Sequence, residues 1–279
     1  MNRLPLETQA LILSQLVEGN SIRSIERVTG VHRDTILRLL KEAGTIALEM
    51  LDSQMMNLEL KRLQVDEIWT FVAKKQRLVK EDDSELVGDQ YVFVALDPDT
   101  KLIPAFSVGK RTLSMATSFM YDLKSRIRTR FQLTTDSLRA YLDAVDFIFG
   151  EDIDYAMLHK QYKAVEGNRG EVRYSPGCII GIRKKVMAGY PDRKHISTSL
   201  VERQNLTMRM NMRRFTRLSN GFSKKLDNLK HALAIHFWHY NFARIHESLR
   251  VTPAMEARLT SHLWSFYDLL NYKNQSQVA

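Results

Sequence analysis

This sequence cannot form an intramolecular disulfide, a cysteine zinc site or a membrane-spanning helix. Cys178 is its single cysteine, so no second thiol is available as a partner. No run of about 18 uninterrupted apolar residues occurs, and we therefore expect no transmembrane helix and no membrane partner. The first 16 residues carry Glu7 and Gln9 among leucines and lack the continuous apolar run of a signal peptide. These absences predict a protein of the reducing cytoplasm.

Positive charge is the main compositional signal. Lys and Arg number 41 against 32 Asp and Glu, which gives a net charge of +9 and a pI near 9.6. A pI above about 9 is typical of nucleic-acid binders. At 279 residues, 44% of them hydrophobic, the chain can build one large domain or two to three small ones.

The first 48 residues predict three helices. Apolar residues recur at helical spacing over residues 6–17, Ser21 can cap a second helix, Gly30 makes a turn, and a third helix runs from Arg33 to near Gly44. This order is that of a helix-turn-helix, in which the third helix meets base edges. The side chains expected to face DNA are Arg33, Asp34, Thr35 and Arg38. A small protein-binding helical module remains an alternative.

From residue 61 the hydrophobic period changes from helical to that of strands. Expected strands cover residues 63–72, 90–96, 103–108, 131–135 and 153–159, with helices over 112–127 and 138–149. The first three strands read as an antiparallel meander.

Three carboxylates stand out because of their positions in the predicted strands and helices. Asp66 interrupts an apolar strand, where an unpaired buried charge would cost several kcal/mol. Asp136 stands where a strand stops, and Glu202 is the single acid at the head of an arginine-rich helix. Two of them have a plainer alternative: Asp136 as a helix N-cap, and Glu202 in a capping box with Ser199. Taken together, three oxygen ligands from separate elements favour a divalent metal site.

Basic residues gather in the second half of the chain. Residues 162–194 read as a hairpin or flap that carries Arg183, Lys184 and Lys185, with an ordinary solvated loop as the alternative. On the helix that follows, Glu202, Asn205 and Arg209 share a face and could meet DNA. That helix is expected to continue through Arg213 to Ser219–Gly221, ahead of a long helix over residues 222–245. His236 and His239 on this long helix read as core or surface histidines rather than metal ligands.

The ordered motifs resemble the insertion-sequence DDE transposases of the retroviral-integrase superfamily, most closely the insertion-sequence-one type. The resemblance is carried by VDEIW with Asp66, QYVFVALDPDT, LTTDS with Asp136, STSLVERQNLTMR with Glu202, and HYNFARIHESLRVTPAMEA. It implies an RNase H-like α/β fold, a mixed five-stranded sheet with flanking helices. Asp97 is excluded as the second aspartate because it begins a turn, and Glu67 is expected to point to the other side of the strand from Asp66.

Five segments follow from the patterns and the resemblance. They are a helix-turn-helix domain (1–48), a linker helix (49–61), a catalytic domain (62–218) with an insertion (162–194), and a helical C-terminal region (219–279).

The resemblance also implies a reaction. Asp66, Asp136 and Glu202 would hold two Mg²⁺ ions, with Mn²⁺ able to substitute, while the enzyme cleaves the ends of an insertion sequence and joins them to target DNA. The partners would be double-stranded DNA, bound at terminal inverted repeats, and a second copy of the chain, in a bacterial or archaeal nucleoid. Rival readings are a catalytically inactive, domesticated transposase that acts as a DNA-binding regulator, and a nuclease that cuts without joining.

Overall fold

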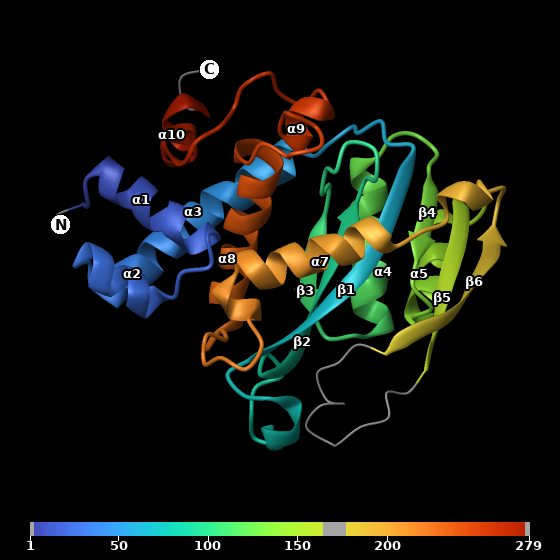
Figure 1. Cartoon of the computed structure of the whole chain (residues 1–279), viewed down its shortest axis with the longest axis horizontal. Coiled ribbons are helices and arrows are strands. Elements are labelled where there is room, and N and C mark those ends of the chain that lie inside the picture. The colour runs from blue at the N-terminus through green and yellow to red at the C-terminus, as the bar shows by residue number, and fades with distance from the viewer. Residues whose placement is uncertain (1–2, 164–176, 277–279) are drawn as a thin grey trace.

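Three helices open the chain, which is described by a computed structural model over residues 3–163 and 177–276 (Figure 1). They are α1 (Leu6–Val17), α2 (Ile22–Thr29) and α3 (Arg33–Gln54). The Ser21 hydroxyl accepts a hydrogen bond from the Ser24 amide at 3.1 Å and caps α2, as the sequence predicts. Gly30 ends α2 with φ +69°, a left-handed conformation that glycine adopts without steric cost.

The third helix does not end near Gly44, as the sequence analysis expected. It continues to Gln54 and includes part of the segment expected to be a separate linker helix. Gly44 is there for close packing rather than for termination, because a Cβ at this position would lie 2.8 Å from the Cα of His231 in α8 (Leu226–Trp238). Farther along, the Trp238 indole N–H of α8 meets the Met50 sulfur of α3 at 2.9 Å. The two helices therefore pack at close range along their lengths.

A mixed sheet forms the centre of the molecule, in the order β3-β2-β1-β4-β5-β6. Its strands are β1 (Arg62–Val72), β2 (Gly88–Leu96), β3 (Phe106–Gly109), β4 (Gln132–Thr135), β5 (Asp154–Lys163) and β6 (Cys178–Ala188). The first three strands form the expected antiparallel meander, and β4 and β5 run parallel to β1. The expected fold class, a mixed sheet flanked by helices, is confirmed.

Two details of the sheet differ from expectation. It has six strands in the described ranges, not five, because residues 178–188 of the expected insertion pair antiparallel with β5 as a hairpin. Residues 164–176 of that insertion lie outside the described part of the chain. The third strand begins at Phe106 rather than at residue 103, since the Ile103 backbone bonds instead to the side chain of Asn241, at 3.0 and 2.9 Å.

Helices cover both faces of the sheet (Figure 1). On one face lie α4 (Leu113–Arg126) and α5 (Arg139–Phe149), whose Phe119 and Tyr141 rings meet Phe93 of β2. In Figure 1, α7 (Ser199–Asn211) crosses β1 on the other face. It ends at Asn211, well before the expected end at Ser219–Gly221, and a short 3₁₀ turn (Arg213–Phe215) follows.

The C-terminal region is helical, as expected. After α8 come a π-helical turn (His239–Ala243), α9 (Pro253–Glu256) and α10 (Phe266–Ser276). The α10 helix packs against α1 and α3 and so returns to the start of the chain. One buried apolar cluster extends from Ile12 of α1 to Leu270 of α10. Within residues 3–163 and 177–276, no helix combines the length and apolar character needed to span a bilayer.

The close contact at Gly44 gives a stability prediction. Gly44→Ala is expected to destabilise the protein, because overpacking costs about 1–3 kcal/mol and the gain in helix propensity returns only about 1 kcal/mol. Urea unfolding should show a lower midpoint. The control is Glu42→Ala on the exposed side of α3, which should change stability by less than about 0.5 kcal/mol. A Gly44→Ala midpoint equal to or above that of the control would contradict the packing argument.

Candidate metal centre

The site is assembled on β1, where Gln64 and Asp66 point to the face that α7 covers. Gln64 Oε1 accepts hydrogen bonds from the Leu200 and Val201 amides at 3.0 and 3.2 Å. These amides belong to the first turn of α7, where backbone donors have no partner inside the helix. Two residues along β1, Asp66 Oδ2 accepts a hydrogen bond from Asn205 Nδ2 at 2.8 Å. The strand therefore holds α7 at two points and fixes the helix over Asp66.

Asp136 reaches the same place from β4. That strand ends at Thr135, which pairs with Val65 of β1, so the next residue emerges beside Asp66. Asp136 Oδ1 accepts a hydrogen bond from the Leu138 amide at 2.9 Å, which holds the turn. The N-cap of α5 is Leu138, so the alternative reading of Asp136 as the helix cap is wrong.

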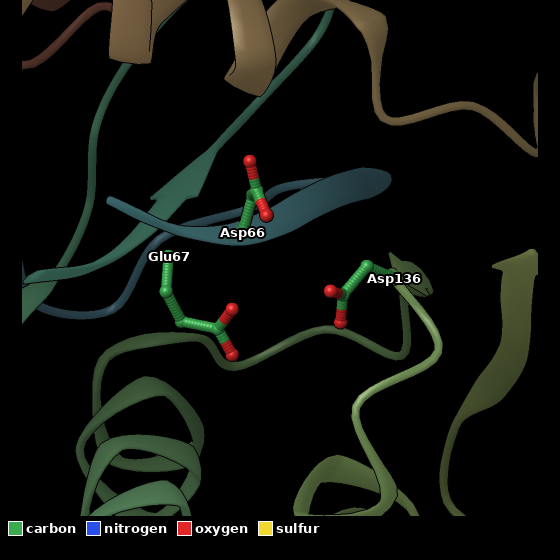
Figure 2. Close-up of side chains that lie close together, drawn as sticks. All are labelled: Asp66, Glu67 and Asp136. Carbon is green, nitrogen blue, oxygen red and sulfur yellow. The ribbon is translucent and has the colours of Figure 1, made fainter. Parts of the chain in front are cut away.

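Glu67 is the member of this cluster that the sequence analysis set aside. Figure 2 shows Asp66 and Glu67 leaving β1 on opposite sides, as predicted, with Asp136 approaching from the end of β4. Even so, one carboxylate oxygen from each of the three residues lies within 4.8 Å of the other two. This is possible because β4 stops opposite Val65, so the edge of β1 that pairs with β4 is unpaired at Asp66 and Glu67, and the long Glu67 side chain can reach around it.

Burial of these carboxylates makes their charges costly. Burial first, and then the charge of Asp136, raise the pKa of Asp66 to about 7. The same two causes raise the pKa of Glu67 to about 7, although Arg111 opposes them. Burial also raises the pKa of Asp136. Three negative charges this close together and shielded from water repel one another, so their ionised forms need nearby positive charge to be stable.

Arg111, just after β3, supplies part of that charge. Its guanidinium lies 3.4 Å from Glu67 Oε2 and 3.6 Å from Asp136 Oδ2. No motif in the sequence pointed to this arginine. Its compensation is incomplete, because Glu67 Oε1 is buried without a hydrogen bond. The Tyr141 hydroxyl is close enough to Glu67 to lower the pKa of that carboxyl. Like Glu67 Oε1, however, this hydroxyl is buried and has no partner within hydrogen-bond distance.

Glu202 lies in the first turn of α7 and borders the cluster. Its Oε1 accepts hydrogen bonds from the Thr198 hydroxyl, at 2.6 Å, and from the Lys160 ammonium on β5. The charge of Glu202 raises the pKa of both Asp66 and Asp136, so it acts on the same site. It does not belong to the group of three that lies within 4.8 Å. The capping-box alternative is wrong, because the N-cap is Thr198 rather than Ser199.

The donor set fits a divalent cation. Carboxylate oxygens are the ligands that Mg²⁺ prefers, and Asp66, Glu67 and Asp136 present them within 4.8 Å. A buried oxygen without a hydrogen bond, Glu67 Oε1, adds a polar atom that a cation can satisfy. Residues outside the sequence prediction that shape this site are Gln64, Glu67, Arg111, Tyr141 and Lys160.

The side chains predicted to touch DNA fall into separate groups. On α3, Arg33 and Arg38 are exposed and Thr35 is half-buried. On β6, Arg183, Lys184 and Lys185 are exposed.

The α7 group is only partly accessible. Asn205 is buried and engaged with Asp66, and Arg209 is half-buried and directed toward the Phe215 carbonyl at 3.4 Å. Burial lowers the pKa of Arg209. Arg213, beyond the end of α7, is exposed.

Three residues that the sequence analysis set aside are Asp97, His236 and His239. Asp97 accepts hydrogen bonds from the Asp99 and Thr100 amides, at 3.1 Å each, within the turn between β2 and β3. His236 is 3% exposed in the core, and the His239 ring stacks on Phe266. Burial lowers the pKa of His236 to about 3 and that of His239 to about 4.

Comparison with known proteins finds distant structural likenesses. No protein-family model and no curated protein matches the chain. The piggyBac transposase synaptic complex with hairpin DNA aligns with 99% of this chain and 71% of its own, at 9% identity and a TM-score of 0.43. The Mos1 transposase paired-end complex aligns with 56% of this chain and 60% of its own, at 12% identity and a TM-score of 0.24. The Mos1 strand transfer complex covers 86% and 78%, at 10% identity and a TM-score of 0.23. At these scores the chain is not assigned to a family.

The raised pKa values predict that stability depends on pH. In the folded metal-free protein the pKa of Asp66 is about 7, above its usual 3.8, so folding takes up a proton between these values. Its favourable contribution is complete below pH about 4 and is lost as the pH rises through about 7. Asp66→Asn should therefore gain stability relative to the wild type between pH 5 and 8. Urea midpoints measured in EDTA across this range test the prediction, and a constant difference between the two proteins would refute it.

The hydrogen bonds from the start of α7 to Gln64 give a second prediction. Gln64→Leu keeps the side chain near its size but leaves the Leu200 and Val201 amides without an acceptor, at a cost of about 1–3 kcal/mol. Thr70→Val on the same face of β1 is the matched control, because it replaces another buried polar side chain on that strand by an apolar one of similar size. Equal urea midpoints for the two variants would show that Gln64 does not hold the helix.

Proposed function

We propose that this chain is a DDE-type transposase of the RNase H-like class, acting on phosphodiester bonds of DNA. The observation that carries the proposal is the approach of carboxylates from β1 and β4 at the end of β4, with Glu202 bordering them from α7. These are the elements on which the family motifs of the sequence place the catalytic acids. The topology of the sheet and the basic composition agree with this reading.

Asp66 and Asp136 would hold the divalent metal, with Glu202 as the third acid of the motif. When bound, the metal would activate the attacking water or 3′-hydroxyl and stabilise the leaving 3′-oxygen. Mg²⁺ is the ion we propose, in a pair, with Mn²⁺ able to replace it. Glu67 stands in the same cluster, and whether it or Glu202 completes the ligand set is decided by the variants below.

The surrounding residues keep this acidic site organised. Asn205 donates to Asp66 Oδ2 and so fixes the orientation of that carboxylate. Arg111 partly neutralises Glu67 and Asp136, which lowers the cost of holding them together. Lys160 does the same for Glu202. None of the three needs to exchange a proton in the reaction.

Double-stranded DNA is the partner that we propose, with α3 reading the element's terminal inverted repeats. Arg33, Thr35 and Arg38 would meet the duplex, and the basic strand β6 would contact phosphates through Arg183, Lys184 and Lys185. A second copy of the chain would pair the two ends, since joining both ends to one target needs two active sites held together.

The decisive experiment measures Mg²⁺-dependent cutting of DNA that carries the element's ends. Asp66→Asn and Asp136→Asn are each expected to lower the cleavage rate by more than the roughly 10–100-fold typical of residues that only support metal ligands. DNA binding in EDTA should persist in both variants. Wild-type protein that binds the ends without cutting them would instead be an inactive, domesticated regulator, and cutting without joined products would indicate a nuclease.

The third acid is settled by a matched pair of variants. Glu202→Gln should lower cleavage as strongly as Asp66→Asn if Glu202 is the third ligand, and Glu67→Gln should then leave most activity. Metal affinity measured by titration with Mn²⁺ provides an independent readout. The reverse order of effects would move the third ligand to Glu67.

A further inference from the structure

Lys160 of β5 lies across the acidic cluster from Asp66. Both β1 and β5 run parallel to β4, which stops at Thr135, opposite Val65 on one side and Met157 on the other. Asp66 is the first residue of β1 past that end, and Lys160 is the third residue of β5 past it. The sheet therefore brings a cation to the place where the carboxylates gather.

The Lys160 side chain lies on the face of β5 that leads to α7. Leu158, two residues earlier and so on the same face, packs with Ile196 in a small buried cluster just ahead of α7. The Lys160 ammonium donates a hydrogen bond to Glu202 Oε1, and the lysine side chain is only 14% exposed. An ammonium this enclosed depends on a nearby negative charge, and Glu202 is the carboxylate that meets it.

Glu202 is held by two donors on one oxygen. Besides Lys160, the Thr198 hydroxyl donates to Oε1 at 2.6 Å. With these bonds made, Glu202 stays outside the group of three carboxylates that lie within 4.8 Å of one another. Its charge nevertheless raises the pKa of Asp66 and of Asp136, so the carboxylate is close to the group it does not join.

The backbone of α7 is held in place on both sides of Glu202. Gln64 of β1 accepts hydrogen bonds from two amides just before Glu202, and the Asn205 side chain bonds to β1 just after it. Because the helix is fastened in this way, rotation of the Glu202 side chain is what can carry its carboxylate into the cluster. That rotation breaks the ion pair with Lys160.

We propose that Lys160 competes with the divalent cation for Glu202, so that the third acid joins the ligand set only by giving up its internal ion pair. The inference rests on the proposed function, which makes Glu202 a metal ligand. Two cations that meet one carboxylate repel each other at short range, so occupancy by one disfavours the other. A purely supporting lysine, which orients Glu202 toward the metal, would have the opposite effect on metal affinity.

The test measures the Mn²⁺ affinity of the full-length protein without DNA, with free Mn²⁺ followed by its electron paramagnetic resonance signal. Lys160→Met removes the ammonium and keeps an unbranched side chain of nearly the same length. It should tighten Mn²⁺ binding about tenfold or more, because the competing ion pair and the repulsion between cations are both lost. Lys160→Gln should show the same gain, whereas Lys160→Arg keeps the charge and should bind as the wild type does.

The matched control is Lys74→Met. It breaks the ion pair of Lys74 with Asp83, just after β1 and away from the cluster, and should leave Mn²⁺ affinity unchanged. A gain in this control equal to that in Lys160→Met would overturn the competition, because any lost positive charge would then have the same effect.

A double-mutant cycle shows whether the effect passes through Glu202. In the Glu202→Gln background, Lys160→Met should change Mn²⁺ affinity by less than about threefold, because the carboxylate under competition is gone. An equal gain in both backgrounds would overturn the proposal, since Lys160 would then repel the metal without competing for Glu202.

Two further results would also overturn it. A loss of Mn²⁺ affinity of about 10–100-fold in Lys160→Met is the mark of a residue that supports a ligand, and an unchanged affinity would leave Lys160 without a role. The proposed function fails separately. A wild type that never cuts DNA would refute the function and leave a gain in Lys160→Met as evidence for the competition. A wild type that cuts DNA, with no gain in the variant, would refute the competition alone.

Discussion

The arrangement of the site depends on one constraint, the clustering of negative charge where β1 runs past the end of β4. Asp66, Glu67 and Asp136 converge there because Thr135 is the last residue of β4 to pair with β1. Carboxylates buried this close together oppose folding when ionised, as the raised pKa values of Asp66 and Glu67 show. Neighbouring hydrogen bonds and ion pairs offset part of that cost. Keeping the three carboxylates together therefore lowers the stability of the metal-free fold.

The polar contacts that offset this cost also place α7. Gln64 satisfies two amides at the start of the helix, and Asn205 bonds to Asp66 one turn past Glu202. The side chain that orients the aspartate is therefore carried by the helix that brings Glu202 to the site. The Asn205 amide therefore bonds to Asp66 within the protein, whereas its position in the sequence had also suggested a contact with DNA.

Periodicity and turn residues predicted the order of strands and helices well, because each element depends on local sequence. The sequence predicted a hairpin or flap over residues 162–194, but it did not predict β6 as a sixth strand of the sheet or the uninterrupted α3, for a different reason. Exposed, basic residues 178–188 resemble a loop until β5 offers its edge, and Gly44 resembles a helix end until His231 is known to lie against it. Glu67 and Arg111 were missed because the open edge of β1 is a property of the folded sheet and has no sequence signature.

The uninterrupted α3 helix has a mechanical consequence. Its first turns carry Arg33 and Arg38, and its last turns are held against α8 by the contact between Met50 and Trp238. A flexible tether between a DNA-reading unit and a catalytic body lets each search independently, and its length sets their effective concentration. A rigid rod removes that freedom. If α3 binds DNA as proposed, the bound DNA would be held at one distance and one angle from the acidic cluster, so the helix itself would set the spacing between the recognised and the cut positions.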